Sequence, residues 1–160
     1  MSGIVNGAGS RSGVIGPHTS PNTPAFLIQS PNMAANHAIN TAVTITFNNE
    51  HFDQTNDFNT GTYTFTAPVG GKYQFNFMGR FDGMADDATY YVVYFKTTQK
   101  TYSYPQDYRY LDADRQTHIG FSMLTFMDPS DTCYVYVYQG GGTATVDITD
   151  DCYFSGFLIG

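Results

Sequence analysis

Residues 58–77 read FNTGTYTFTAPVGGKYQFNF, and the spacing of residue types in this stretch predicts the fold of the chain. The segment YQFNF at 73–77 alternates aromatic and polar residues, so its three aromatic side chains share one face of a strand. Turn residues precede this strand at Gly61 and at positions 68–71. We therefore expect two strands packed back to back, with the aromatic side chains filling the interior between two sheets.

The rest of the chain consists of short runs with a similar alternation, separated by turn residues, and no stretch has a sustained helical period. This pattern is typical of an all-β sandwich or barrel, and it predicts about nine or ten strands in two sheets. The segment 97–117 is expected to be a long connection. The expected strands are 25–29, 43–47, 62–66, 73–78, 89–96, 118–126, 133–138, 143–148 and 153–159.

The composition limits the possible partners of the chain. Its 160 residues are enough for one domain with one core. Only 13% of the residues are charged, the formal net charge is −7, and Lys and Arg together number 7. Because phosphate binding depends on clustered Lys and Arg, we expect no nucleic-acid partner. No apolar run reaches the roughly 18 residues that cross a bilayer, and the N-terminus has no secretion signal, so no membrane insertion is expected.

Cys133 and Cys152 are the only cysteines. Their number is far below that of a disulfide-stapled secreted domain, so two free thiols are expected, with a bridge between them as the alternative. Neither cysteine has a His at a chelating spacing, and structural zinc is therefore not expected.

The four histidines, His18, His37, His51 and His118, stand singly, and the chain has no Gly-x-Ser-x-Gly motif. A Ser-His-Asp set needs a nucleophile on a strained turn beside a base. No catalytic residue is assigned, and we expect that the chain is not an enzyme.

Calcium is the one ion for which the sequence offers ligands. Asp82, Asp86 and Asp87 lie in one expected turn, and oxygen-rich turns are what calcium requires. None of the acidic turns matches an EF-hand loop, and acidic turns are most often solvated. A calcium site and a hydrated turn both stay open, and no other cofactor is expected.

The stretch at 58–77 resembles the signature of the C1q globular-domain family, which has an aromatic residue, Thr-Gly, a strand, Ala-Pro or Cys-Pro, Gly, and a Tyr-x-Phe-x-Phe strand. The segment 154–159 is similar to the closing strand of that family and 24–26 to its opening strand. Asp131, ahead of the run at 133–138, matches its Gly-Asp position. The resemblance covers 24–160 and implies a C1q/TNF-like ten-stranded jelly roll that packs as a homotrimer.

The expected trimer needs an interface, and the run at 133–138 offers one. Val135 and Val137 form one face of this run, and the tyrosines between them form the other. A row of Tyr suits an interface because each ring buries apolar area while its hydroxyl stays satisfied, although Tyr is also common on ordinary strand surfaces. The interface candidates are Tyr134, Tyr136, Tyr138, Phe154 and Phe157.

The expected connection at 97–117 mixes Tyr with charged residues, which is common in binding loops. We expect it to form a recognition surface. The candidates there are Tyr102, Tyr104, Tyr108, Arg109 and Tyr110.

Residues 1–23 form a separate Gly- and Pro-rich segment that cannot build a core, and we expect an extended arm ahead of a domain at 24–160. The chain has no Gly-x-y repeat, so the collagen stalk of animal C1q proteins is missing. The arm instead resembles the N-terminus of many marine bacteriophage virion proteins. Its candidate attachment residues are Ile4, Val5, Arg11, Val14 and Ile15.

Together these features predict a non-enzymatic, trimeric phage structural protein located in the virion, at the capsid or tail surface. The arm would bind the major capsid protein or a tail component, and the head would serve as a capsid decoration (cement) protein or as the adhesive knob of a short tail fibre that contacts a host-surface glycan. The alternative is a soluble C1q/TNF-like recognition module that binds a glycan or receptor through its loops.

Overall fold

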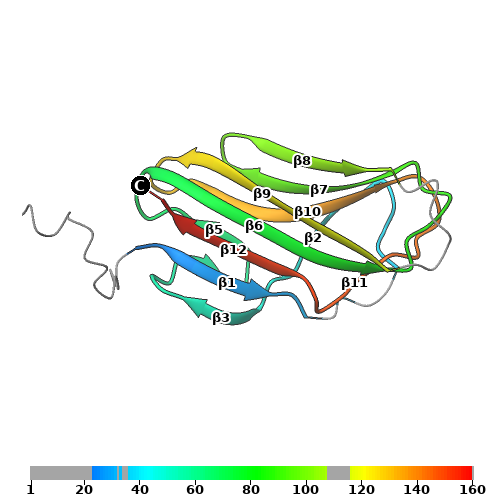
Figure 1. The fold of residues 1–160 in the computed structure, drawn as a ribbon, viewed down its shortest axis with the longest axis horizontal. Coiled ribbons are helices and arrows are strands. Elements are labelled where there is room, and N and C mark those ends of the chain that lie inside the picture. Colours follow the sequence, from blue (N-terminus) through cyan, green and yellow to red (C-terminus); the bar gives the residue numbers. More distant parts are fainter. Residues whose placement is uncertain (1–22, 32, 34–35, 108–115, 160) are drawn as a thin grey trace, which may run out of the picture.

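The computed structural model describes residues 23–31, 33, 36–107 and 116–159 of the chain, and these form two stacked antiparallel sheets (Figure 1). We name the sheets after their longest central strands. No helix in the described residues is long and apolar enough to cross a membrane. The β6 sheet has the order β9, β6, β12, β1, β3, with β11 also paired to β6, and the β10 sheet has the order β4, β5, β10, β7, β8, with β2 also paired to β10.

The strands of the β6 sheet are β1 (Ala25–Gln29), β3 (Asn49–Asp53), β6 (Gly71–Asp82), β9 (Thr117–Met127), β11 (Asp147–Ile148) and β12 (Tyr153–Leu158). Those of the β10 sheet are β2 (Ala42–Thr44), β4 (Phe58–Asn59), β5 (Thr64–Thr66), β7 (Tyr90–Thr97), β8 (Thr101–Gln106) and β10 (Thr132–Gly140). Every expected strand overlaps an observed one, and the all-β sandwich is confirmed.

Three strands were missed, and one expectation was wrong. β3 and β4 carry no clear alternation in sequence, because β3 is mostly exposed and β4 is only two residues long. The segment 97–117 is not one long connection, since β8 occupies residues 101–106 of it. β8 contains Pro105, which an edge strand tolerates because no strand among the described residues pairs with its outer side.

Aromatic rings fill the space between the sheets, as the segment at 73–77 predicts. Tyr73, Phe75 and Phe77 all lie in the core. The ring of Phe26 on β1 lies with its centroid 5.0 Å from that of Phe154 and 6.3 Å from that of Phe75. Aromatic contacts at these separations stabilise a core beyond the apolar area that they bury.

Gly156 on β12 is where two of these rings meet the backbone. It pairs with Phe26 on one side and Phe75 on the other. A Cβ at Gly156 would lie 2.6 Å from a ring carbon of Phe75 and 2.7 Å from one of Phe26. The two rings therefore occupy the space that any other residue would need, and this requirement explains a glycine in the middle of a central strand.

We expect Gly156→Ala to lower the free energy of unfolding by about 1–3 kcal/mol, because the buried rings must move to admit the methyl group. Gly120→Ala on β9 is the matched control, since a Cβ there meets only the Phe77 carbonyl oxygen at 3.6 Å. Urea unfolding of both variants measures the difference. Equal stabilities would contradict the packing described around Gly156.

Cys133 and Cys152 are free and fully buried, so the prediction of two free thiols is confirmed and the bridge is not formed. Burial raises the pKa of the Cys152 thiol to about 12 and raises the pKa of Cys133 well above its usual range. Because the thiolate is the reactive form, both residues should be inert in the folded chain.

Ellman's reagent tests this directly. The native protein should release no colour at neutral pH, and the denatured protein should titrate both cysteines. A native chain that reacts at once would mean that a thiol reaches solvent. A denatured, unreduced chain with no titratable thiol would mean that the cysteines are bridged.

Candidate interaction surfaces

The outward side of the β6 sheet carries large apolar side chains that no other part of the described chain covers. Phe126 is 57% exposed, Leu124 55%, Met78 54% and Phe157 43%. Cross-strand pairing joins them, since Gln74 on β6 lies between Leu124 and Phe157. We call this surface the apolar face; it comprises Leu27, Phe52, Met78, Leu124, Phe126 and Phe157.

The middle of the apolar face is polar but uncharged. Gln74 donates a hydrogen bond to Asn76 Oδ1 at 3.2 Å, and Asn76 donates one to Ser155 Oγ at 3.3 Å. Arg80, on the same strand, is held by Asp82 at 2.7 Å and by Asp151 at 3.1 Å. Lys72 lies opposite Phe126, so the charges on this side of β6 lie toward the two ends of the strand, and the middle has the apolar and amide side chains typical of an interface core.

A shallow hollow of about 330 Å³ lies in the apolar face. Leu27, Met78 and Tyr153 form most of its apolar wall, and Asn76 and Ser155 add polar atoms. The hollow is large enough to receive a side chain from a neighbouring molecule.

The three tyrosines of β10 lie on the opposite side of the molecule from the apolar face. Val135 and Val137 point into the core, as the alternation predicts, so Tyr134, Tyr136 and Tyr138 point outward from the β10 sheet. The ring of Tyr136 stacks on Tyr94 of β7 with centroids 4.5 Å apart, and that of Tyr138 stacks on Tyr90 with centroids 6.0 Å apart. Tyr134 packs against Tyr136 on its own strand, with centroids 6.0 Å apart. We call this surface, made of Tyr90, Tyr94, Tyr134, Tyr136 and Tyr138, the tyrosine face.

The five residues predicted for the trimer interface therefore do not share one surface. Phe157 belongs to the apolar face, whereas the three tyrosines belong to the tyrosine face. Phe154 was wrongly included, because it is 0% exposed and packs against Phe26 and Phe75 in the core. Alternation along β12 explains the difference, since residues 154 and 157 point to opposite sides of the strand.

Two of the recognition candidates lie on β8 rather than in a loop. Tyr102 is half-buried, and its hydroxyl lies 2.8 Å from Thr125 Oγ1 on β9, which joins the two sheets at this edge. Tyr104 is exposed, but its ring stacks on Phe121 with centroids 5.4 Å apart. Tyr108, Arg109 and Tyr110 lie outside the described residues, as do the arm candidates Ile4, Val5, Arg11, Val14 and Ile15.

The structure gives the three calcium candidates different surroundings. The Asp82 carboxylate forms a salt bridge with the Arg80 guanidinium. Asp87 accepts hydrogen bonds from the backbone and hydroxyl of Thr143, both at 2.9 Å, which lower its pKa, and Asp86 is exposed. Among the described residues, no three His, Cys, Asp or Glu side chains form a group that could hold a metal ion.

Three of the four histidines are described. His51 is exposed and its Nε2 lies 3.0 Å from Gln29 Oε1. His118 is exposed on β9, where it lies opposite Arg80 of β6 in the strand register. His37 is half-buried, and burial lowers its pKa, although Asp147 opposes the shift. His18 lies outside the described residues.

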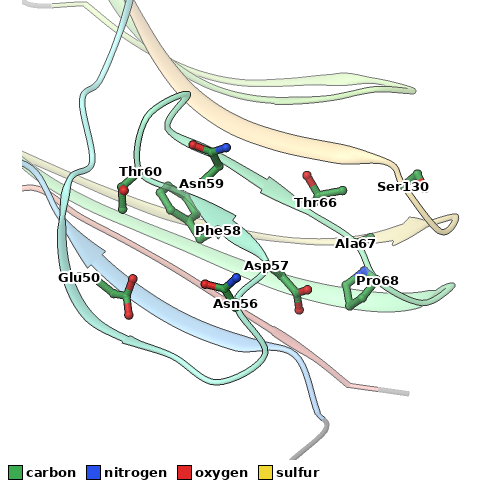
Figure 2. Close-up of a pocket in the computed structure, with 10 residues that line it drawn as sticks. All are labelled: Glu50, Asn56, Asp57, Phe58, Asn59, Thr60, Thr66, Ala67, Pro68 and Ser130. Carbon is green, nitrogen blue, oxygen red and sulfur yellow. The ribbon is translucent and has the colours of Figure 1, made fainter.

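A pocket of about 550 Å³ opens where β3 and β4 form the edges of the two sheets (Figure 2). Phe58 and Ala67 form a floor that is almost fully buried, with exposed fractions of 5% and 1%. Its rim is polar, and Figure 2 shows Glu50 on one side and Pro68 and Ser130 on the other. The full lining is Glu50, Asn56, Asp57, Phe58, Asn59, Thr60, Thr66, Ala67, Pro68 and Ser130.

Short hydrogen bonds fix the frame of the pocket. The backbone N–H of Thr66 donates to the Asp57 carbonyl oxygen at 2.8 Å, and that of Phe58 donates to Asp53 Oδ2 at 2.8 Å. Burial raises the pKa of Asp57, and the charge of Asp53 adds to the shift, whereas a hydrogen bond from Thr55 opposes it. Sequence reasoning missed this site because it depends on the two strands that show no alternation.

The chain is similar to known proteins in sequence pattern and in fold. The C1q domain family model matches residues 25–159. No curated protein sequence matches the chain. The globular domain of zebrafish complement 1qA protein superposes with a TM-score of 0.64 at 18% identity, over 86% of this chain and 98% of that one.

Two further solved structures share the fold. Murine APRIL superposes with a TM-score of 0.60 at 6% identity, over 86% of this chain and 99% of its own. The PRD1 vertex protein P5 superposes with a TM-score of 0.60 at 12% identity, over 86% of this chain and 98% of its own. At these identities the superpositions support the common fold.

Proposed function

The chain belongs to the C1q domain family, and we propose that it is a homotrimeric structural head that attaches to and binds other surfaces without catalysing a reaction. Domains with the C1q/TNF-like fold are in general recognition or structural modules. The fold found here is the jelly roll of that family, in two antiparallel sheets. This membership supports a structural or binding role. The exposed apolar and aromatic surfaces of the chain support the more specific roles proposed below.

The apolar face supports the assembly of several copies of the chain, and the C1q family implies that their number is three. Leu124 and Phe126 on the edge strand β9 and Met78 on the neighbouring strand β6 are each more than half exposed. Soluble proteins seldom leave several large apolar side chains exposed on one side of a sheet. Three copies related by a closed rotation would cover the apolar face, and the hollow beside Met78 would receive a side chain of the neighbour.

We further propose that the trimer is part of a phage virion, fastened through residues 1–23 to the major capsid protein or a tail component. The glycine-rich arm supports this, and so does the fold shared with a protein described as a vertex protein. Three arms on one trimer bind multivalently, which raises affinity by roughly 10² to 10⁴ over that of one arm. The head would then serve in capsid decoration or as an adhesive fibre knob.

The second candidate is a soluble recognition module. Its support is the family itself, together with the exposed aromatic surface around Tyr104. In this case the arm would be dispensable, and substitutions at Tyr102 or Tyr104 would abolish binding.

We expect the double variant Leu124→Asp, Phe126→Asp to be a folded monomer, because two carboxylates in an apolar interface would lose hydration without gaining partners. Val69→Asp is the matched control, since Val69 is 46% exposed in a turn outside the apolar face. Light scattering on a sizing column gives the mass. An unchanged assembly in the double variant would contradict an interface at this face.

Deletion of residues 2–16 should leave a folded trimer that no longer attaches to particles. Phage assembled with the full chain, with the deletion, or with residues 2–16 replaced by a Gly/Ser segment of equal length would be compared by quantitative mass spectrometry. We expect full occupancy in the first case and a loss of at least about tenfold in the other two. Equal occupancy in all three would contradict attachment through the arm and favour the recognition module.

A further inference from the structure

The pocket between β3 and β4 is lined mostly by polar side chains, and it has no role in the proposed trimer or in attachment through residues 1–23. It lies at the edge of the sandwich where β3 ends the β6 sheet (Figure 1) and β4 ends the β10 sheet. Its volume of about 550 Å³ lies within the range of small-molecule sites. A site for a ligand at this edge would be independent of the apolar face.

The lining favours a neutral ligand that both donates and accepts hydrogen bonds. Glu50 and Asp57 supply carboxylates, which only accept, and Asn56 and Asn59 supply amides, which do both. Thr60, Thr66 and Ser130 add hydroxyl groups at the rim. No Lys, Arg or His lines the pocket, so anionic ligands are disfavoured.

Several of these polar groups have no partner within the part of the chain that is described. The side chains of Glu50, Asn56, Thr66 and Ser130 make no hydrogen bond there, and they face solvent at the rim. Asn59 uses its Oδ1 to accept from the backbone of Gly61 at 2.8 Å and of Thr62 at 3.0 Å, which leaves its NH₂ group to donate. The rim therefore presents acceptors and donors together.

The frame beneath this rim is already ordered. The Ser130 N–H donates to the Ala67 carbonyl oxygen at 2.8 Å, and the Thr66 N–H donates to the Asp57 carbonyl oxygen at the same distance. These bonds connect the turns on both sides of the floor formed by Phe58 and Ala67. A site that is fixed before binding loses less entropy when a ligand enters.

We propose that this pocket binds a neutral saccharide. Sugar hydroxyl groups donate to carboxylates such as Glu50 and Asp57 and accept from amides such as Asn59, which matches the mostly polar lining of the pocket. A cation is the competing occupant of an acidic pocket, yet the described residues hold no group of three metal-ligating side chains.

The test uses the isotopically labelled full chain and four neutral sugars, namely glucose, galactose, mannose and N-acetylglucosamine. We expect at least one of them to shift the side-chain amide signals of Asn56 and Asn59 in NMR titrations. No shift with any of the four sugars would overturn the proposal. Shifts of the same signals by calcium chloride alone would overturn it as well, because the pocket would then be a cation site.

Variants locate the site. Glu50→Gln and Asp57→Asn should each weaken sugar binding by about tenfold, which is the effect of one lost hydrogen bond to a charged group. Glu50 is exposed, so its substitution does not threaten folding. Asp150→Asn, at an exposed carboxylate outside the pocket, should bind like the parent chain. Sugar binding that survives both pocket variants would place the site elsewhere.

The native mass, measured on the same samples, separates this proposal from the proposed trimer. Sugar binding by a monomer would support the pocket and contradict the trimer. A trimer that binds no sugar would support the proposed trimer and contradict sugar binding in the pocket.

Discussion

Phe26, Phe75 and Phe154 contact one another in the core, and the first two pack over the backbone of Gly156, which holds three strands of the β6 sheet in place. This packing joins β1, β12 and β6 at one point of the core and fixes their register. Because strand residues alternate, Phe75 pointing inward requires Gln74 and Asn76 to point outward. A slip of one residue would exchange the two sides of the sheet and expose the aromatic rings.

The outward surfaces follow from this register. On the β6 sheet the outward positions of β9 hold Leu124 and Phe126, so the same alternation that fills the core leaves an apolar face. On the β10 sheet the outward positions hold stacked tyrosines whose hydroxyl groups can stay hydrated. We infer that the first face is covered by neighbouring subunits and that the second stays accessible.

Alternation also explains how much could be predicted. The strands at 73–77 and 133–138 have inward aromatic or β-branched residues and outward polar residues, and both were predicted with the correct sides. Phe154 was placed at an interface because the sequence of β12 is apolar on both sides, and only the sandwich shows which side faces the core. The assignment of Tyr102 to a loop failed because β8 is an edge strand with Pro105.

The pocket between β3 and β4 could not have been found in the sequence. Its lining comes from the two strands without alternation and from turns near residues 68 and 130, which meet only because both sheets end at this edge. The spacing of residues along the chain does not predict that these strands and turns lie side by side.

The mass of the unmodified protein in solution shows whether the apolar face is buried between three subunits. Sedimentation equilibrium over a wide range of concentrations should give three times the 17.7 kDa of one chain, with no monomer except at high dilution. A mass of 17.7 kDa at every concentration would contradict the trimer, because the apolar face would then remain in water.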